Sequence, residues 1–79
     1  MRTYSLKAIR TNLGYTLEEA SKLIGISKYT LWNYENYKTT PNTENTTKIL
    51  NAYGMHYNEI RFLPNTQEKK KLAVKKYMK

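Results

Sequence analysis

The segment from Thr16 to Glu35 constrains the fold most, because it reads as two short helices separated by one glycine. Thr16 and Glu19 have the spacing of a capping box, in which the hydroxyl and the carboxylate each bond a backbone amide at the start of a helix. Gly25 follows the apolar positions of that helix, and glycine suits the left-handed conformation in which many helices end. Ser27 can then cap a second helix. The segment therefore predicts two helices joined by a tight turn.

The flanking residues extend this pattern to five helices. Apolar residues at helical spacing predict helices over residues 5–13 and 43–53, and Gly14 and Gly54 end them. A fifth short helix is expected over residues 57–62, where Ile60 would reach the core before Pro64. The chain shows neither strand-like alternation nor a hairpin signal. We therefore expect an all-α fold, a compact five-helix bundle that contains a helix-turn-helix.

The positive charge divides the chain into two parts. Its net charge is +8, and residues 64–79 hold six lysines and one glutamate, a net charge of +5 that leaves +3 for residues 1–63. We expect residues 1–63 to form the helix-turn-helix domain and residues 64–79 a basic C-terminal tail, either disordered or marginally helical. So basic a chain suggests an anionic partner, most simply nucleic acid.

Several separate motifs together resemble one known family, the Xre/Cro/CI family of phage and bacterial regulators. The matching positions are Arg10, residues 16–20 (TLEEA), residues 23–27 (LIGIS), Leu31, Glu35, Pro41 and residues 57–60 (YNEI). The resemblance implies the five-helix architecture of phage-repressor DNA-binding domains. More narrowly, the chain looks like a small phage lysogeny-switch regulator, either Cro-like or of the modulator-of-repression type. It departs from the family at Leu17, where glutamine is usual, and at residues 36–38, where a basic residue and glycine are common.

The resemblance also implies a structural salt bridge between Arg10 and Glu35. In the family this pair joins the first helix to the third and is partly buried. The alternative is that both charged groups are merely solvated, although charged residues rarely lie beside a core unpaired. If the bridge forms, the loss of one partner leaves the other charge stranded.

The outward face of the predicted third helix is the candidate DNA-reading surface. On a helix over residues 28–36, base edges would be read by Lys28, Tyr29, Trp32 and Asn33. Asparagine can pair with adenine, lysine can donate to guanine, and aromatic rings can pack on thymine methyls or sugars. Phosphate contacts are expected at helix ends and the following loop, from Thr16, Asn36, Tyr37, Lys38 and Thr39.

The same face leaves an alternative open, because aromatic residues are enriched in protein-binding hot spots. Tyr29 and Trp32 would then bind a protein instead of DNA. A third interpretation has Trp32 packed under the tail or against Tyr37.

Composition argues against enzymes, metal sites and membrane proteins. The chain has no cysteine, one histidine (His56), scattered carboxylates and no phosphate-binding glycine loop. We therefore expect no catalytic residues, no metal, no cofactor and no small-molecule substrate. No apolar run approaches the length that crosses a membrane, so we expect no membrane partner and a cytoplasmic protein.

Two functions follow from these observations. The first is a sequence-specific DNA-binding transcriptional regulator of the phage Cro/repressor type, which acts in a genetic switch on double-stranded DNA, with a homodimer as a further expectation. The alternative is an antirepressor, a modulator of repression that binds a CI-type repressor protein through its helix-turn-helix domain. The aromatic surface and the weak charge of residues 1–63 favour the alternative, whereas Lys28, Asn33 and the basic tail favour the first function.

Overall fold

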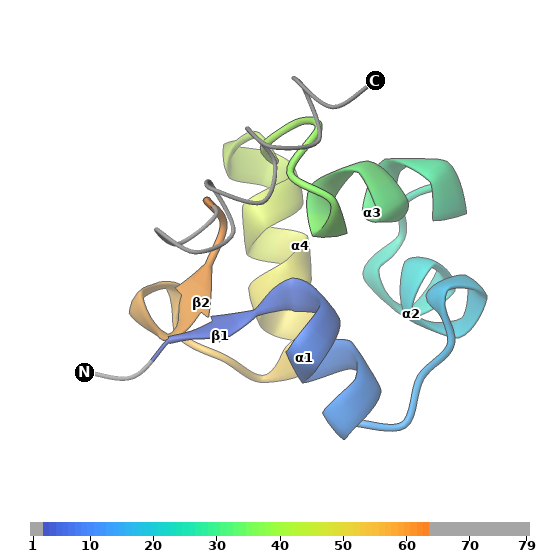
Figure 1. The fold of residues 1–79 in the computed structure, drawn as a ribbon, viewed down its shortest axis with the longest axis horizontal. Coiled ribbons are helices and arrows are strands. Elements are labelled where there is room, and N and C mark those ends of the chain that lie inside the picture. Colours follow the sequence, from blue (N-terminus) through green and yellow to red (C-terminus); the bar gives the residue numbers. More distant parts are fainter. Residues whose placement is uncertain (1–2, 64–79) are drawn as a thin grey trace, which may run out of the picture.

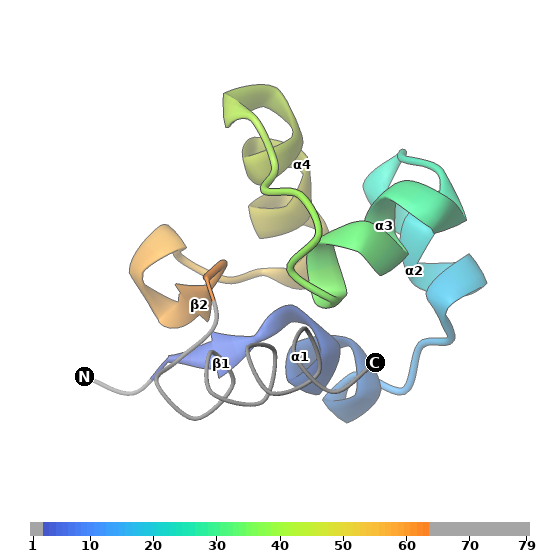
Figure 2. The same cartoon turned by 45° about the horizontal axis from the view of Figure 1, so that its top comes forward.

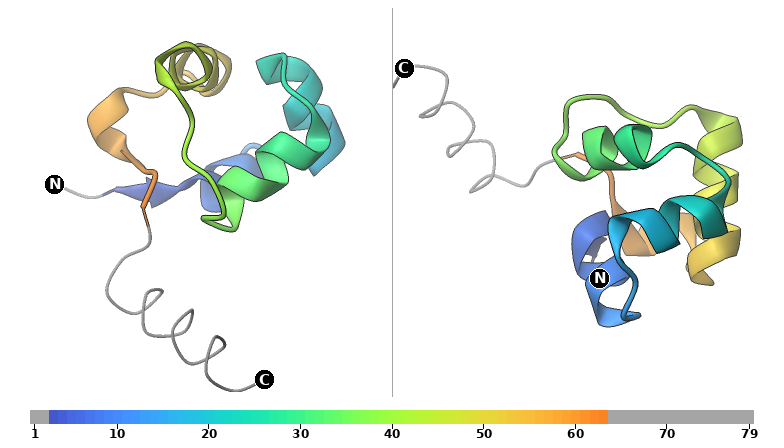
Figure 3. Two further views of the ribbon diagram at one scale, coloured as in Figure 1. Left: turned by 90° about the horizontal axis from the view of Figure 1, so that it is seen from above. Right: turned by 90° about the vertical axis from the view of Figure 1, so that its right-hand side faces the viewer.

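The computed structural model describes residues 3–63, and the predicted tail, residues 64–79, lies outside them. The described elements are β1 (Tyr4–Ser5), α1 (Leu6–Asn12), α2 (Leu17–Ile24), α3 (Lys28–Glu35), α4 (Thr43–Tyr53), the 3-10 helix η1 (Tyr57–Glu59) and β2 (Ile60–Arg61). Figure 1 shows α2 and α3 on one side of the molecule and the two strands on the other. Figure 2 and the view from above in Figure 3 show the same separation.

Polar side chains fix where the four α-helices within residues 3–63 begin. The side-chain oxygens of four residues each accept a hydrogen bond from a backbone amide three positions later: Ser5, Thr16, Ser27 and Asn42. Such caps satisfy amides that the helix itself leaves without a partner. The predicted capping box is present, with Thr16 N donating to Glu19 Oε1 at 2.9 Å and Glu19 N donating to Thr16 Oγ1 at 3.1 Å.

The core lies where the four helices meet. Its buried members are Leu6, Ile9, Ala20, Ile24, Leu31, Tyr34, Ile49, Tyr53 and Ile60. Helix α2 packs against both α3 and α4, and α1 packs against α3. Leu13, the last residue of the helix predicted over residues 5–13, follows the end of α1 at Asn12 and is 48% exposed. The core therefore holds α3 from two sides.

The expectation of an all-α, five-helix bundle is wrong. Residues 57–59 form only a 3-10 turn, in which the Ile60 amide donates to the Tyr57 carbonyl. The chain then becomes extended, and β2 pairs in parallel with β1 in the register Tyr4 to Ile60 and Ser5 to Arg61. The pairing satisfies backbone groups that a fifth helix would have satisfied internally, and Ile60 still reaches the core. Within residues 3–63 the fold is four α-helices and a small two-stranded parallel sheet.

Candidate nucleic-acid interface

The turn between α2 and α3 depends on one glycine. Gly25 has a φ angle of 92°, and its amide donates to the Ser21 carbonyl at 2.8 Å. A side chain at this φ would be strained, so glycine is the residue that lets the chain reverse here. Ser27 begins α3 two residues later, and its hydroxyl accepts from Thr30 N at 3.0 Å and donates to Thr30 Oγ1 at 2.7 Å. The chain therefore enters α3 in a fixed direction.

The inner face of α3 is fixed to the core. Leu31 is completely buried and Tyr34 is 6% exposed, as the helical spacing predicts. The Tyr34 hydroxyl accepts a hydrogen bond from Asn45 Nδ2 at 2.8 Å, which joins α3 to α4. No local pattern around Asn45 indicates this contact, because it depends on how two helices cross.

The predicted pair between Arg10 and Glu35 is present in the structure and joins α1 to the end of α3. Arg10 Nε donates to Glu35 Oε2 at 2.7 Å and Arg10 Nη2 to Glu35 Oε1 at 3.1 Å, so the contact is bidentate. Arg10 Nη1 also donates to the Tyr15 carbonyl at 2.9 Å. The hydrogen bonds to Glu35 raise the pKa of Arg10 above its ordinary value, although burial opposes this. This ion pair therefore holds the C-terminal end of α3 against α1.

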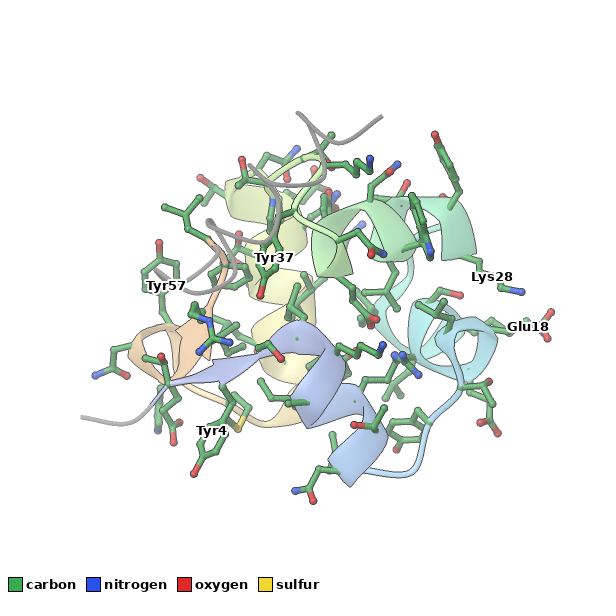
Figure 4. The ribbon with its side chains drawn as sticks, in the orientation of Figure 1. Tyr4, Glu18, Lys28, Tyr37 and Tyr57 are labelled. Carbon is green, nitrogen blue, oxygen red and sulfur yellow. The ribbon has the colours of Figure 1, made fainter. Side chains whose placement is uncertain are left out.

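The outer face of α3 carries the four residues predicted to read bases. Lys28 is exposed, and Figure 4 shows its side chain projecting from the start of α3 at the edge of the molecule. Tyr29 is 71% exposed and Trp32 41% exposed, and their rings stack with centroids 6.3 Å apart and planes within 9°. Asn33 is half-buried. We call Lys28, Tyr29, Trp32 and Asn33 the outer face. The structure places these residues together but does not test what they bind.

The residues predicted to touch phosphates lie at both ends of the motif. Asn36 follows α3, and its Nδ2 donates to the Trp32 carbonyl at 2.9 Å. Lys38 and Thr39 are exposed in the loop before α4. Thr16 caps α2 instead, and both its backbone amide and its hydroxyl are used in bonds with Glu19. The polar groups of Thr16 are therefore engaged within the cap of α2.

Tyr37 has a backbone role that the sequence did not reveal. Its φ is +59°, the only positive φ at a residue other than glycine among residues 3–63. The Tyr37 amide donates to the Tyr34 carbonyl at 3.3 Å and the Lys38 amide to the Asn33 carbonyl at 2.9 Å, a pattern that ends helices in a left-handed residue. Tyrosine therefore occupies a position that normally favours glycine. Figure 4 shows its ring on the strand side of the molecule, away from Lys28.

The α2 side of the motif is acidic. Glu18 and Glu19 lie in the first turn of α2. The backbone hydrogen bond with Thr16 lowers the pKa of Glu19, so its carboxylate remains charged at neutral pH. Figure 4 shows Glu18 on the same edge of the molecule as Lys28. Because like charges repel, the start of α2 is a poorer phosphate site than the loop that holds Lys38 and Thr39.

Neither a metal site nor a membrane span is found in the described part of the chain. Among residues 3–63, no three histidine, cysteine or acidic side chains gather closely enough to hold a metal ion. None of the helices in that range has the length and apolar character needed to cross a bilayer.

Comparison with known proteins assigns the family. A family model described as a helix-turn-helix domain matches residues 3–65, most of the chain, and no curated protein matches it. Domains of this family are typically non-enzymatic and indicate a DNA-binding transcription regulator. The capped helices, the turn at Gly25 and the exposed face of α3 agree with that match. The chain belongs to the helix-turn-helix domain family.

Proposed function

We propose that the protein is a sequence-specific transcription regulator that places the outer face of α3 in the major groove of double-stranded DNA. The observation that carries this proposal is the contrast within α3, whose inner residues Leu31 and Tyr34 are buried while Tyr29 and Trp32 face solvent. The major groove is about 12 Å wide and admits one α-helix, so a helix anchored on one side and bare on the other suits it.

Each outer-face residue has a distinct role in this proposal. Lys28 donates to guanine, and Asn33 makes a paired contact to adenine. Tyr29 and Trp32 supply apolar contacts with the bases or sugars. Phosphates are contacted at the C-terminal end of α3 and in the next loop, by Asn36, Tyr37, Lys38 and Thr39, with a smaller contribution from Thr16.

The tail and the oligomeric state complete the proposal. Residues 1–63 act as the DNA-recognition domain, and residues 64–79, with a net charge of +5, strengthen binding to any DNA sequence. A homodimer would read two half-sites about one helical turn apart. The resemblance to phage regulators of the Cro and repressor type supports a role in a genetic switch.

Selection from a random duplex library, followed by fluorescence anisotropy, tests DNA recognition. Asn33→Ala should weaken the selected site by about 1–3 kcal/mol and relax discrimination at one base pair. Lys48→Ala is the control, because Lys48 lies on α4 and contacts Glu44 at 3.9 Å. Specific binding that Asn33→Ala leaves unchanged would contradict the assignment of α3 to the major groove.

A second candidate function is an antirepressor that captures a CI-type repressor. The stacked, exposed pair of Tyr29 and Trp32 favours it, because clustered aromatic residues are typical of protein-binding hot spots. The acidic first turn of α2 also suits a basic DNA-binding domain better than it suits DNA.

Calorimetry with a purified CI-type repressor domain tests the second candidate. Trp32→Ala should weaken such a complex by about 2 kcal/mol or more, as truncation of an aromatic hot spot does. Asn33→Ala serves as the matched control, since it removes a polar neighbour on the same helix. If the repressor domain shows no binding heat with the intact chain, the antirepressor function is eliminated.

A further inference from the structure

The rings of Tyr29 and Trp32 form one continuous apolar surface at the start of α3. They lie one helical turn apart, and their planes are within 9° of parallel at a centroid distance of 6.3 Å. Stacking at this distance is favourable and restricts the rotation of both rings. The two stacked rings therefore present one joint surface on the outer face.

The two rings carry one hydrogen-bonding group each, the Tyr29 hydroxyl and the Trp32 indole N–H, and their other atoms are apolar. The Thr30 hydroxyl accepts a hydrogen bond from Ser27, and the Asn36 amide donates to the Trp32 carbonyl. Asn33 is half-buried, which leaves Lys28 as the fully exposed polar side chain near the rings on the outer face. Beside the polar contacts proposed for Lys28 and Asn33, the exposed area of the two rings offers apolar contact to the bases.

Thymine is the base that offers such a contact. In the major groove the other bases present hydrogen-bond donors and acceptors, whereas thymine also presents its C5 methyl group. Two adjacent thymines on one strand place two methyl groups side by side, about 3.4 Å apart along the helix axis and further apart laterally because of the helical twist. A pair of parallel rings 6.3 Å apart can cover both methyl groups.

We infer, resting on the proposed DNA-binding function, that Tyr29 and Trp32 determine specificity by packing on the C5 methyl groups of a thymine–thymine step. Lys28, one residue before Tyr29, contacts a neighbouring guanine or phosphate and adds affinity without reading the methyl groups.

Replacing thymine by deoxyuridine tests this inference, because it removes only the methyl group and leaves every hydrogen bond in place. The full chain is first used to select its preferred duplex from a random library, and each thymine of that duplex is then replaced in turn. Affinity should fall about three- to fourfold at each of two adjacent thymines, as expected for one methyl-sized apolar group, and about tenfold when both are replaced. Replacement at other thymines should leave affinity unchanged.

Protein variants show which residues read the methyl groups. In Trp32→Ala and Tyr29→Ala, the ratio of affinities for the thymine and deoxyuridine duplexes should approach one at the position that the missing ring covered. Lys28→Ala should weaken both duplexes equally and keep the ratio. Circular dichroism checks that each variant is folded, and the deoxyuridine duplexes need no protein variant at all.

The possible failures are distinguishable. Specific binding that no methyl removal weakens, or a selected site without adjacent thymines, would overturn the inference and leave the proposed DNA function intact. If selection enriches no sequence at all, the proposed function fails and the inference fails with it.

Discussion

The two ends of α3 differ in almost every physical respect, although they are only seven residues apart. At the C-terminal end, Glu35 forms a bidentate pair with Arg10, and the neighbouring Tyr34 accepts a hydrogen bond from Asn45. Nearer the N-terminus, Tyr29 and Trp32 contact each other on the outer face and face solvent, whereas Leu31 between them is buried. One short helix therefore combines an anchored end with a presented end.

This contrast teaches how so small a domain can support recognition. The free energies of unfolding of small proteins are only about 5–15 kcal/mol. Exposed aromatic residues are therefore tolerated only where the stability of the fold does not depend on them. The buried pair and the Tyr34 contact fix the position of α3, so residues at the other end can be chosen for a partner. We expect stability and binding to respond to different substitutions.

The largest effect on stability is expected at the anchored end. Glu35→Ala should lower the free energy of unfolding by about 3 kcal/mol or more, because Arg10 is 8% exposed and would keep its charge without a carboxylate to neutralise it. Urea denaturation followed by circular dichroism measures the change. Glu44→Ala is the matched control, since its pair with Lys48 is exposed and should contribute less than about 1 kcal/mol. If both variants lose equally little stability, the pair of Arg10 and Glu35 does not hold α3 in place.

Alkaline pH should destabilise the fold through Tyr53, a buried residue at the end of α4. Burial, with a smaller contribution from the Glu35 carboxylate, raises the pKa of Tyr53 to about 12, against about 10 for an ordinary tyrosine. Below pH 10 both folded and unfolded states keep the proton, so stability is unaffected. Between about pH 10 and 12 only the unfolded state releases it, and stability falls as pH rises, by up to about 1.4 kcal/mol per pH unit.

Tyr53→Phe should remove this part of the alkaline loss. Its hydroxyl is buried and makes no hydrogen bond with residues 3–63, so the change should cost little at neutral pH. Chemical denaturation at a series of pH values compares the two proteins. Identical pH profiles above pH 10 would show that the Tyr53 hydroxyl is not shielded from solvent.

A smaller effect is expected at Tyr37, where α3 ends. Tyr37→Gly should be more stable than Tyr37→Ala by about 1 kcal/mol, because alanine keeps the cost of the left-handed backbone that glycine avoids. Both variants lose the same ring, so their difference isolates the backbone. Thermal unfolding of the pair measures it, and equal stabilities would mean that the loop relaxes out of the left-handed conformation.

The smallest effect is expected at the presented end. Tyr29→Ala should change the free energy of unfolding by no more than about 0.5 kcal/mol, since the residue is 71% exposed. The same denaturation experiment used for Glu35→Ala provides the comparison. A loss as large as that of Glu35→Ala would erase the distinction between the two ends.

Local signals made the helix-turn-helix predictable from the sequence. The capping box at Thr16, the glycine at position 25 and the cap at Ser27 each act within a few residues, so their spacing alone locates α2 and α3. The pair of Arg10 and Glu35 came from family resemblance, and the exposure of Tyr29 and Trp32 from helical spacing. The roles of these outer-face residues in binding stay predictions.

Contacts between distant segments were not predictable in the same way. Residues 60–61 became a strand because they pair with residues 4–5, and two residues per strand are too few for alternation to show. The contact of Asn45 with Tyr34 depends on how α4 packs against α3. The left-handed residue at the end of α3 is a local feature, but it was not predicted because tyrosine stands where glycine is usual. Tertiary geometry decided the strand pairing and the contact of Asn45, which local propensity does not encode.

The parallel pairing of β1 with β2 also sets when the protein can finish folding. Tyr4 pairs with Ile60, so the pairing closes nearly the whole described chain into a single loop. Long-range closure of this kind is slow, because the entropy of the intervening chain is lost before the contact forms. During synthesis, α2 and α3 can pair as soon as both have left the ribosome, whereas β1 must wait exposed until residue 61 follows. We therefore expect the closure of β1 on β2 to form after the contact between α2 and α3.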